Sequence, residues 1–185
     1  MIRTLVLLAS FGVAVPAAGQ ADPAVQRFLT RSGVPAQAFA VFTGSQADAY
    51  RLLGPPASDA TFPDEADGGP EFRVLSYPAA GVADLELTLC REPDLQRLGL
   101  SDPRAFCAMA LVQRPAPQAQ MQRRATDLRR ALTGMTRDTF DVGDVRYFVF
   151  DGFTMSVEMR QGEASRTALV LKRHRPGAAG DSPSP

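Results

Sequence analysis

The sequence has very few of the side chains on which enzymes and metal proteins commonly depend. Its 185 residues include no tryptophan, one histidine and two cysteines, and the only lysine is Lys172. Histidine is the usual acid or base at neutral pH, and zinc or copper sites need several histidine or thiolate ligands. The histidine, His174, lies at the edge of the expected C-terminal tail, and Lys172 lies at the end of the last expected strand. No glycine-rich phosphate-binding motif is present. We therefore expect no metal, no cofactor and no enzymatic activity.

Asparagine is also absent, isoleucine occurs once, at Ile2, and all the basic residues except Lys172 are arginine. This bias is typical of a GC-rich bacterial genome, so arginine is not by itself a sign of a binding site. The absence of asparagine excludes N-linked glycosylation. The 20 basic residues balance 20 acidic ones. We therefore expect no nucleic-acid partner and no attraction to an anionic membrane surface.

The sequence lacks an apolar run long enough to span a membrane, since the longest one, Leu5–Val15, has about half the length needed. This run follows Arg3 and precedes Pro16 and three small residues, which is the pattern of a secretory signal peptide over residues 1–19. The alternative is an uncleaved anchor. We expect an exported protein, periplasmic or secreted, whose mature chain starts near Gln20.

The two cysteines lie in two consecutive expected strands, 82–90 and 105–112. Residues of the first strand alternate between apolar and polar, whereas the second strand is apolar on both faces. Residues 91–104 between them have room for one or two helical turns. If the strands pair antiparallel, Cys90 and Cys107 face each other at the Cα separation of about 5.5 Å that a disulfide needs. An oxidising compartment favours this disulfide, with a stabilisation of about 3 kcal/mol, over two separate thiols.

Apolar periodicity predicts the other elements. We expect helices at 23–32, 46–53 and 118–133, and strands at 37–43, 72–77, 144–150, 153–160 and 167–171. In the second helix, Ala47, Tyr50 and Leu53 are expected to face inward. The last three strands are expected to form a meander in which 153–160 has one core face and one solvent face, and 167–171 is the closing strand.

The segment 54–70 is rich in proline, glycine and acidic residues, and we expect a long exposed loop there. Asp64, Glu65 and Asp67 offer oxygen ligands to calcium, but their spacing does not match an EF-hand. We therefore favour a solvated acidic loop without a metal.

The expected fold is α+β, with one antiparallel sheet of about five to seven strands, two or three helices packed on one face, and one disulfide. We expect a single domain over residues 20–173. The last residues, 174–185, have no apolar periodicity and are expected to form a disordered tail.

One helix has a basic side. Arg123, Arg124 and Arg130 lie opposite the apolar stripe of the helix predicted at 118–133. These arginines are the candidate partner-binding residues, and a solvated helix face is the alternative.

The leading functional prediction is a non-enzymatic binding or assembly module of the bacterial envelope, whose partner is another envelope or secreted protein. A second hypothesis is a carrier of small apolar ligands, lined by Phe148, Phe150, Phe153 and Met155. A third is a carboxylate-dependent hydrolase that uses Glu86 and Glu158, the acidic residues on the polar faces of two expected strands.

Overall fold

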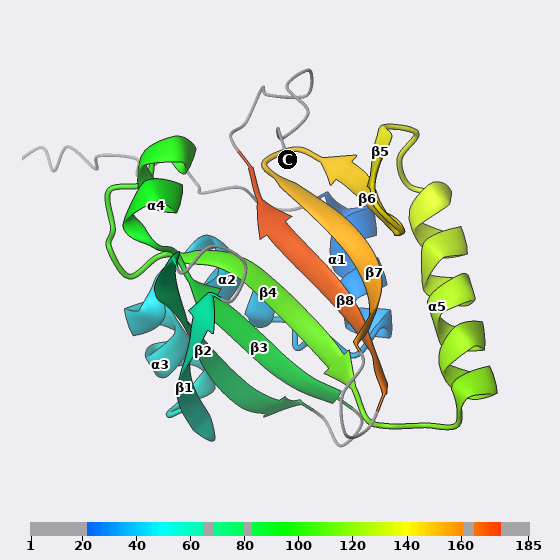
Figure 1. The fold of residues 1–185 in the computed structure, drawn as a ribbon, viewed down its shortest axis with the longest axis horizontal. Helices are drawn as coiled ribbons and strands as arrows, with labels where there is room; N and C mark the ends of the chain where they lie inside the picture. The colour runs from blue at the N-terminus through cyan, green and yellow to red at the C-terminus, as the bar shows by residue number, and fades with distance from the viewer. Residues whose placement is uncertain (1–21, 65–68, 80–82, 161–164, 175–185) are drawn as a thin grey trace, which may run out of the picture.

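The computed structural model describes four stretches of the chain (Figure 1), which are residues 22–64, 69–79, 83–160 and 165–174. The predicted signal peptide 1–19 lies outside these residues, and so does the predicted tail 174–185 except for His174.

Five helices and eight strands form in this part of the chain. The helices are α1 (Pro23–Arg31), α2 (Ala38–Thr43), α3 (Gln46–Leu53), α4 (Glu92–Leu98) and α5 (Gln118–Thr133). The strands are β1 (Ser58–Asp64), β2 (Gly69–Ala79), β3 (Ala83–Leu89), β4 (Phe106–Gln113), β5 (Thr139–Val142), β6 (Val145–Phe150), β7 (Phe153–Arg160) and β8 (Arg166–Arg173).

The eight strands form one antiparallel sheet in the order β1-β2-β3-β4-β8-β7-β6-β5. Two meanders of four strands lie side by side, and their last strands, β4 and β8, pair in the middle of the sheet (Figure 1). This seam runs from Ala108 opposite Lys172 to Val112 opposite Ala168. The predicted α+β fold with an antiparallel sheet and a disulfide is confirmed, with eight strands and five helices in place of the smaller numbers expected.

The two extra strands lie at the two edges of the sheet. β1 falls inside the segment 54–70, where the prediction of a loop was wrong. An edge strand pairs on one side only and buries little, so the polar residues of β1 and the four residues of β5 show no apolar pattern. The predicted meander of the last three strands is confirmed by the successive pairing of β6, β7 and β8, and β8 pairs in addition with β4.

The main hydrophobic core lies between one face of the sheet and the helices, which Figure 1 shows behind the strands and beside β7. Helix α5 contributes the buried side chains of Met121, Ala125 and Leu132, as its apolar stripe predicted. Helix α1 begins where the Asp22 carboxylate accepts a hydrogen bond from the Ala24 backbone N–H at 2.7 Å. None of the helices in the described stretches combines the length and the apolarity of a membrane-spanning helix.

Two predictions about local structure near the N-terminus were wrong. Residues 38–43, predicted as a strand, form helix α2, because a short run that is apolar on both faces fits a buried helix as well as a buried strand. In helix α3, Ala49 is the buried residue and Leu53 packs against the core, whereas Ala47 and Tyr50 are exposed.

The predicted solvent face of β7 is also mostly buried. All five residues from Phe153 to Val157 are buried, including the polar Thr154 and Ser156. The alternation correctly identifies a strand, but it does not show which polar positions are exposed, since Thr154 and Ser156 are buried whereas Glu158 and Arg160 further along are not.

The predicted disulfide joins Cys90, just after β3, to Cys107 in β4, with a Cα–Cα distance of 4.9 Å. The disulfide closes the connection between β3 and β4, which contains α4. At its neck the Cys90 backbone N–H also donates to the Ala105 carbonyl at 2.9 Å, so the two strands are held together by a covalent bond and a hydrogen bond.

Candidate binding surface on the open face of the sheet

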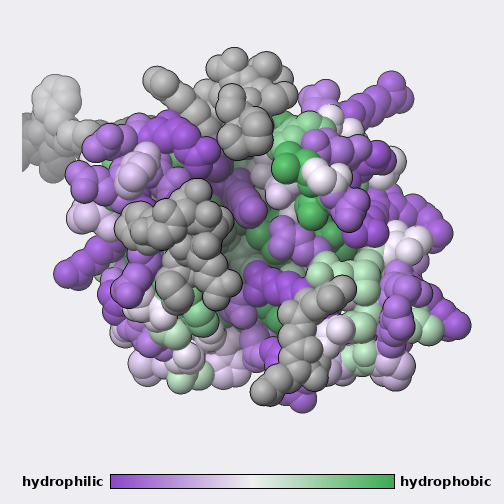
Figure 2. All heavy atoms as spheres, in the orientation of Figure 1, coloured by the Kyte–Doolittle hydropathy of each residue, from purple (hydrophilic) through white to green (hydrophobic). Residues whose placement is uncertain are grey.

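Helices α1, α2, α3 and α5 pack on one face of the sheet, whereas α4 contributes no buried residue. Within the described residues no helix or strand covers the other face, which we call the open face. Its centre is a second buried cluster, formed by Ala110 and Val112 of β4 and Ala168 and Val170 of β8. Figure 2 looks onto this face and shows it hollowed in the middle, with hydrophilic residues gathered in the hollow and hydrophobic residues beside it. The small side chains of the seam therefore form the floor of a trough.

An ion pair crosses this trough. Arg160 Nη1 of β7 donates to Glu86 Oε2 of β3 at 2.6 Å. Because β8 and β4 lie between these two strands, the paired side chains extend over the seam. The pair links the two meanders, although its partial exposure to water limits its net contribution to about 1 kcal/mol or less.

Glu86 and Glu158, the two carboxylates of the hydrolase hypothesis, both lie on the open face. Each has a separate partner, since Glu158 Oε1 accepts a hydrogen bond from Ser156 Oγ at 2.9 Å and Glu86 binds Arg160. Their strands are three strand spacings apart, about 14 Å between backbones. Carboxylates that flank a scissile glycosidic bond stand about 5 to 10 Å apart, and the hydrolase hypothesis stays a prediction.

Both margins of the open face carry aromatic side chains. The margin on β5 and β6 is apolar and consists of Phe140, Val142, Val145, Tyr147 and Val149. The Phe140 and Tyr147 rings stack with centroids 5.0 Å apart, and Val142 is 47% exposed. On β1 and β2, the Phe62 and Phe72 rings stack at 5.6 Å, and Phe62 is 45% exposed. Apolar groups gathered on one face in this way are typical of an interaction surface.

A row of paired residues runs across the open face between these margins. Its members, in sheet order, are Val74, Thr88, Ala108, Lys172, Thr154 and Val149. The exposed Lys172 Nζ lies 5.6 Å from the centroid of the Tyr147 ring, which is a cation–π contact. The row therefore places one cation near the middle of the face.

The predicted partner-binding arginines lie elsewhere, on α5. Arg123 and Arg130 are exposed and line a shallow depression on the outer side of the helix, whereas Arg124 is half-buried. Arg130 Nη1 lies 3.4 Å from Asp127 Oδ1. The arrangement is an ordinary charged helix face, and a binding role for these arginines stays a prediction.

The residues proposed to line a ligand pocket pack tightly instead. Phe148, Phe153 and Met155 belong to the main hydrophobic core, and Phe150 packs against it with its ring stacked on Phe153 at 5.3 Å. The His174 ring lies 2.8 Å from the Phe150 carbonyl oxygen through Nε2, which ties the end of β8 to the β6–β7 hairpin.

A charged cleft of about 530 Å³ lies next to the disulfide. Its lining residues include Glu71, Arg73, Arg91 and Arg104. Two of these arginines are already paired, Arg73 with Asp59 through two hydrogen bonds and Arg91 with an aspartate of α4. The bonds from Arg73 hold the pKa of the Asp59 carboxyl below its ordinary value. The cleft is open to solvent, and it is lined by both acidic and basic side chains.

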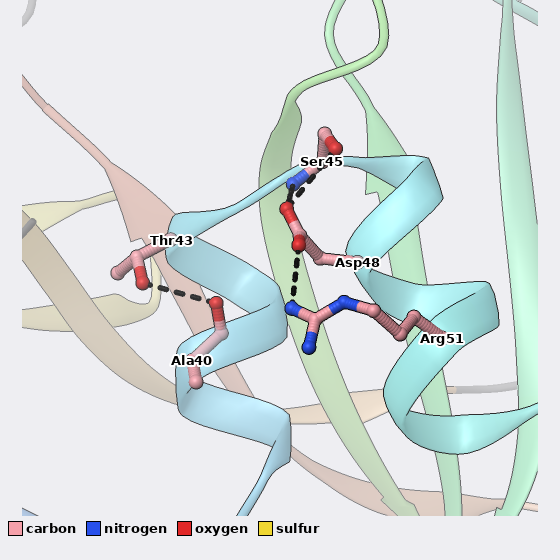
Figure 3. Close-up of polar contacts among 5 residues, drawn as sticks. All are labelled: Ala40, Thr43, Ser45, Asp48 and Arg51. Atoms are coloured by element: carbon pink, nitrogen blue, oxygen red, sulfur yellow. Dashed lines mark hydrogen bonds and ion pairs between the residues drawn. The ribbon is translucent and has the colours of Figure 1, made fainter.

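Short polar contacts fix the junction of α2 and α3. The Asp48 carboxylate accepts hydrogen bonds from the Ser45 backbone N–H and hydroxyl, both at 3.1 Å, and pairs with Arg51 at 2.9 Å (Figure 3). These bonds lower the pKa of Asp48, with Arg51 making the largest contribution. Gly44 leaves room for the carboxylate, because a Cβ at this position would lie 2.6 Å from Asp48 Oδ2.

Arg173 of β8 reaches the same junction from the sheet. Its Nη2 donates to the carbonyl oxygens of Phe42 and Gly44 at the end of α2, and its guanidinium lies over the Phe42 ring at 5.3 Å. Burial lowers the pKa of Arg173 to about 10, so the side chain is charged at neutral pH. A cation at the C-terminal end of a helix compensates the exposed carbonyl groups, and this contact is structural.

Comparisons with protein-family models, with curated proteins and with solved structures found no match to this chain. The functional argument therefore rests on the geometry of the open face.

The sequence pattern contained a signal for this face. Glu86, Thr88, Thr154, Ser156 and Glu158 are the polar members of alternating strands, and they share one face. What sequence reasoning missed was the pairing of β4 with β8, which puts the polar faces of the two meanders next to each other and Lys172 between them.

Proposed function

We propose that the protein is an exported, non-catalytic binding or assembly module of the bacterial envelope whose protein partner docks on the open face. One observation carries the proposal: helices cover one face of the sheet, whereas the other face presents exposed apolar side chains such as Val142 and Phe62 along a trough. Covering these groups releases apolar surface from water, which favours association.

Export is supported by the predicted signal peptide 1–19 and by the Cys90–Cys107 disulfide, because such bonds persist in oxidising compartments. N-terminal sequencing of the protein from fractionated cells tests it. We expect a chain that starts near Gln20 in the periplasm or the medium. An intact chain starting at Met1 in the cytoplasm would contradict export.

The binding proposal is tested by affinity capture of the tagged protein from cross-linked envelope extract, read by mass spectrometry. Two charge variants locate the surface: Val142→Glu puts a charge on the apolar margin, and Arg130→Glu reverses a charge on α5. We expect a stoichiometric partner that is lost with Val142→Glu and kept with Arg130→Glu. Capture that is lost with Arg130→Glu but kept with Val142→Glu would place the interface on α5. The absence of any captured partner would contradict the proposal.

Two measurements separate the other functional classes. Native mass spectrometry of the purified protein detects a co-purified small ligand, whose extra mass would favour the carrier hypothesis. Turnover on a panel of hydrolase substrates, lost in Glu86→Gln or Glu158→Gln, would favour the hydrolase hypothesis instead.

A further inference from the structure

Within the described stretches, no acidic side chain pairs with the cation at the centre of the open face. Among the described residues, Lys172 forms no salt bridge, and its recorded contact is with the Tyr147 ring. By contrast, Arg160 on the same face is neutralised by Glu86. Among the described residues of this face, Arg160 therefore has an anionic partner and Lys172 has none.

The neighbours of Lys172 are also hydrogen-bond donors. Thr154 lies directly opposite Lys172, and Thr88 lies one residue further along the row, beyond Ala108. Neither threonine hydroxyl has a hydrogen-bond partner among the described residues. The Lys172 ammonium group and the Thr154 hydroxyl on the neighbouring strand can therefore share one acceptor, whereas Thr88 lies two strand spacings from Lys172, at about 10 Å. A carboxylate is the protein group that best satisfies such donors.

Docking a partner on this face removes water from the ammonium group. Burying an unpaired cation costs several kcal/mol, whereas a carboxylate supplied by the partner offsets that cost. A partner that covers the apolar margin must therefore place a hydrogen-bond acceptor at Lys172. Otherwise water must remain between the partner and the row of residues that contains Lys172.

The shape of the face distinguishes a polypeptide from a small amphiphile. Small-ligand sites are concave and enclose most of the ligand, whereas the open face is a broad trough with apolar side chains on both margins and Lys172 between them. A protein segment with apolar side chains on both sides of an acidic one matches this order.

We propose that Lys172 is the anchor for an aspartate or glutamate side chain of the partner protein, flanked by apolar residues that cover the two margins. This inference rests on the proposed function and names the chemistry of the partner.

The composition of the chain makes the test specific. Because Lys172 is the only lysine, a zero-length carbodiimide cross-link from this protein to a partner carboxylate forms at Lys172 or at the N-terminal amine, and peptide mapping separates the two. Lys172→Arg is the matched control, since it keeps the positive charge but does not form the cross-link. Lys172→Gln removes the charge as well. Because Lys172 is exposed, both variants should keep the wild-type melting temperature.

We expect the wild-type complex to give a cross-link between Lys172 and an internal aspartate or glutamate of the partner. Partner affinity should stay close to the wild-type value in Lys172→Arg and fall about tenfold or more in Lys172→Gln. Equal affinity of all three proteins, or a cross-link to the partner's C-terminal carboxylate, would overturn the inference.

The outcomes separate this inference from the proposed function. If Val142→Glu abolishes capture while Lys172→Gln does not, the open face is the interface but Lys172 is not its anchor. If no partner is captured, both the proposed function and the inference about Lys172 are overturned. Lys172-dependent binding to phosphatidylglycerol vesicles, without a protein partner, would assign the cation to a lipid headgroup and likewise overturn the inference.

Discussion

At the scale of single residues, the contact between Gly44 and Asp48 controls the start of α3. The Asp48 carboxylate caps the helix and occupies the space that a side chain at position 44 would need. We expect Gly44→Ala to lower the free energy of unfolding by about 1 kcal/mol, the usual cost of losing a cap. Urea denaturation measures it.

A double-mutant cycle checks the cause. In an Asp48→Ala background the cap is already lost, so Gly44→Ala should cost much less there. Equal costs in the two backgrounds would mean that the methyl group acts through some other contact.

The hydroxyl of Tyr77 is a second residue with a predictable effect. It is buried on the core side of β2 and has no hydrogen-bond partner among the described residues, and burial raises its pKa. Because an unsatisfied buried hydroxyl costs free energy, Tyr77→Phe should stabilise the protein by about 1 kcal/mol. Thermal unfolding measures this, with Tyr50→Phe on the exposed side of α3 as a control that should change little. A destabilised Tyr77→Phe variant would point to a water bound at the hydroxyl.

The ion pair between Asp59 and Arg73 predicts part of the pH dependence. Hydrogen bonds from Arg73 lower the pKa of Asp59 below its ordinary value of 3.8, so the folded state releases this proton more readily than the unfolded state. The pair therefore stabilises the fold above that pH, and the stabilisation is lost as the pH falls through the lower folded pKa.

We expect the difference in unfolding free energy between wild type and Asp59→Asn to be largest above pH 4 and to shrink toward pH 2. Urea titrations across this range measure it, and Arg73→Gln should give the same profile. The effect is small because both side chains are partly exposed. A difference that stays constant with pH would show that the carboxylate acts by packing and not by charge.

At the scale of secondary-structure elements, the disulfide determines how firmly α4 is held. It closes a loop with a sequence separation of 17 residues. We expect the Cys90→Ala, Cys107→Ala double variant to lose about 3 kcal/mol of stability. Denaturation with and without reductant measures the loss, since the reductant should affect only the wild type. Hydrogen exchange should accelerate in α4, and unchanged exchange there would place the effect elsewhere.

The elements also show how far the sequence could predict the fold. Helix α5 was predicted correctly because Met121, Ala125 and Leu132 follow a regular apolar stripe that ends before a glycine. Residues 38–43 were assigned to the wrong element because a run that is apolar throughout contains no period. β1 was missed because an edge strand needs few apolar residues.

The candidate site was less predictable than the elements. Glu86 and Glu158 were correctly placed on polar strand faces, and Lys172 was noted at the end of a strand. That they share one face depends on the pairing of β4 with β8, and long-range pairing leaves no local trace in a single sequence.

At the scale of the whole molecule, the sheet consists of two meanders joined at one seam. Within each meander, neighbouring strands also follow one another along the chain, whereas the seam pairs Val112 with Ala168 and Ala108 with Lys172. Pairing over a long stretch of chain is slow because it carries a larger loss of chain entropy. Pulsed hydrogen exchange during refolding should therefore show protection in the β2–β3 and β6–β7 pairs before the β4–β8 pair. Simultaneous protection would indicate that the seam belongs to the folding nucleus.

The position of β8 also bears on what happens to incomplete copies of the protein. Seven of the eight residues of β4 are apolar. Before β8 pairs with it during folding, β4 is an edge strand with one side unpaired. Among the described strands, β8 is the last to be synthesised. A chain truncated before residue 166 would keep β4 as an unpaired apolar edge strand, which promotes aggregation and recognition by proteases. Pairing with β8 thus removes the exposed edge of β4, so that a chain gains this protection only once residues 166–173 have joined the sheet.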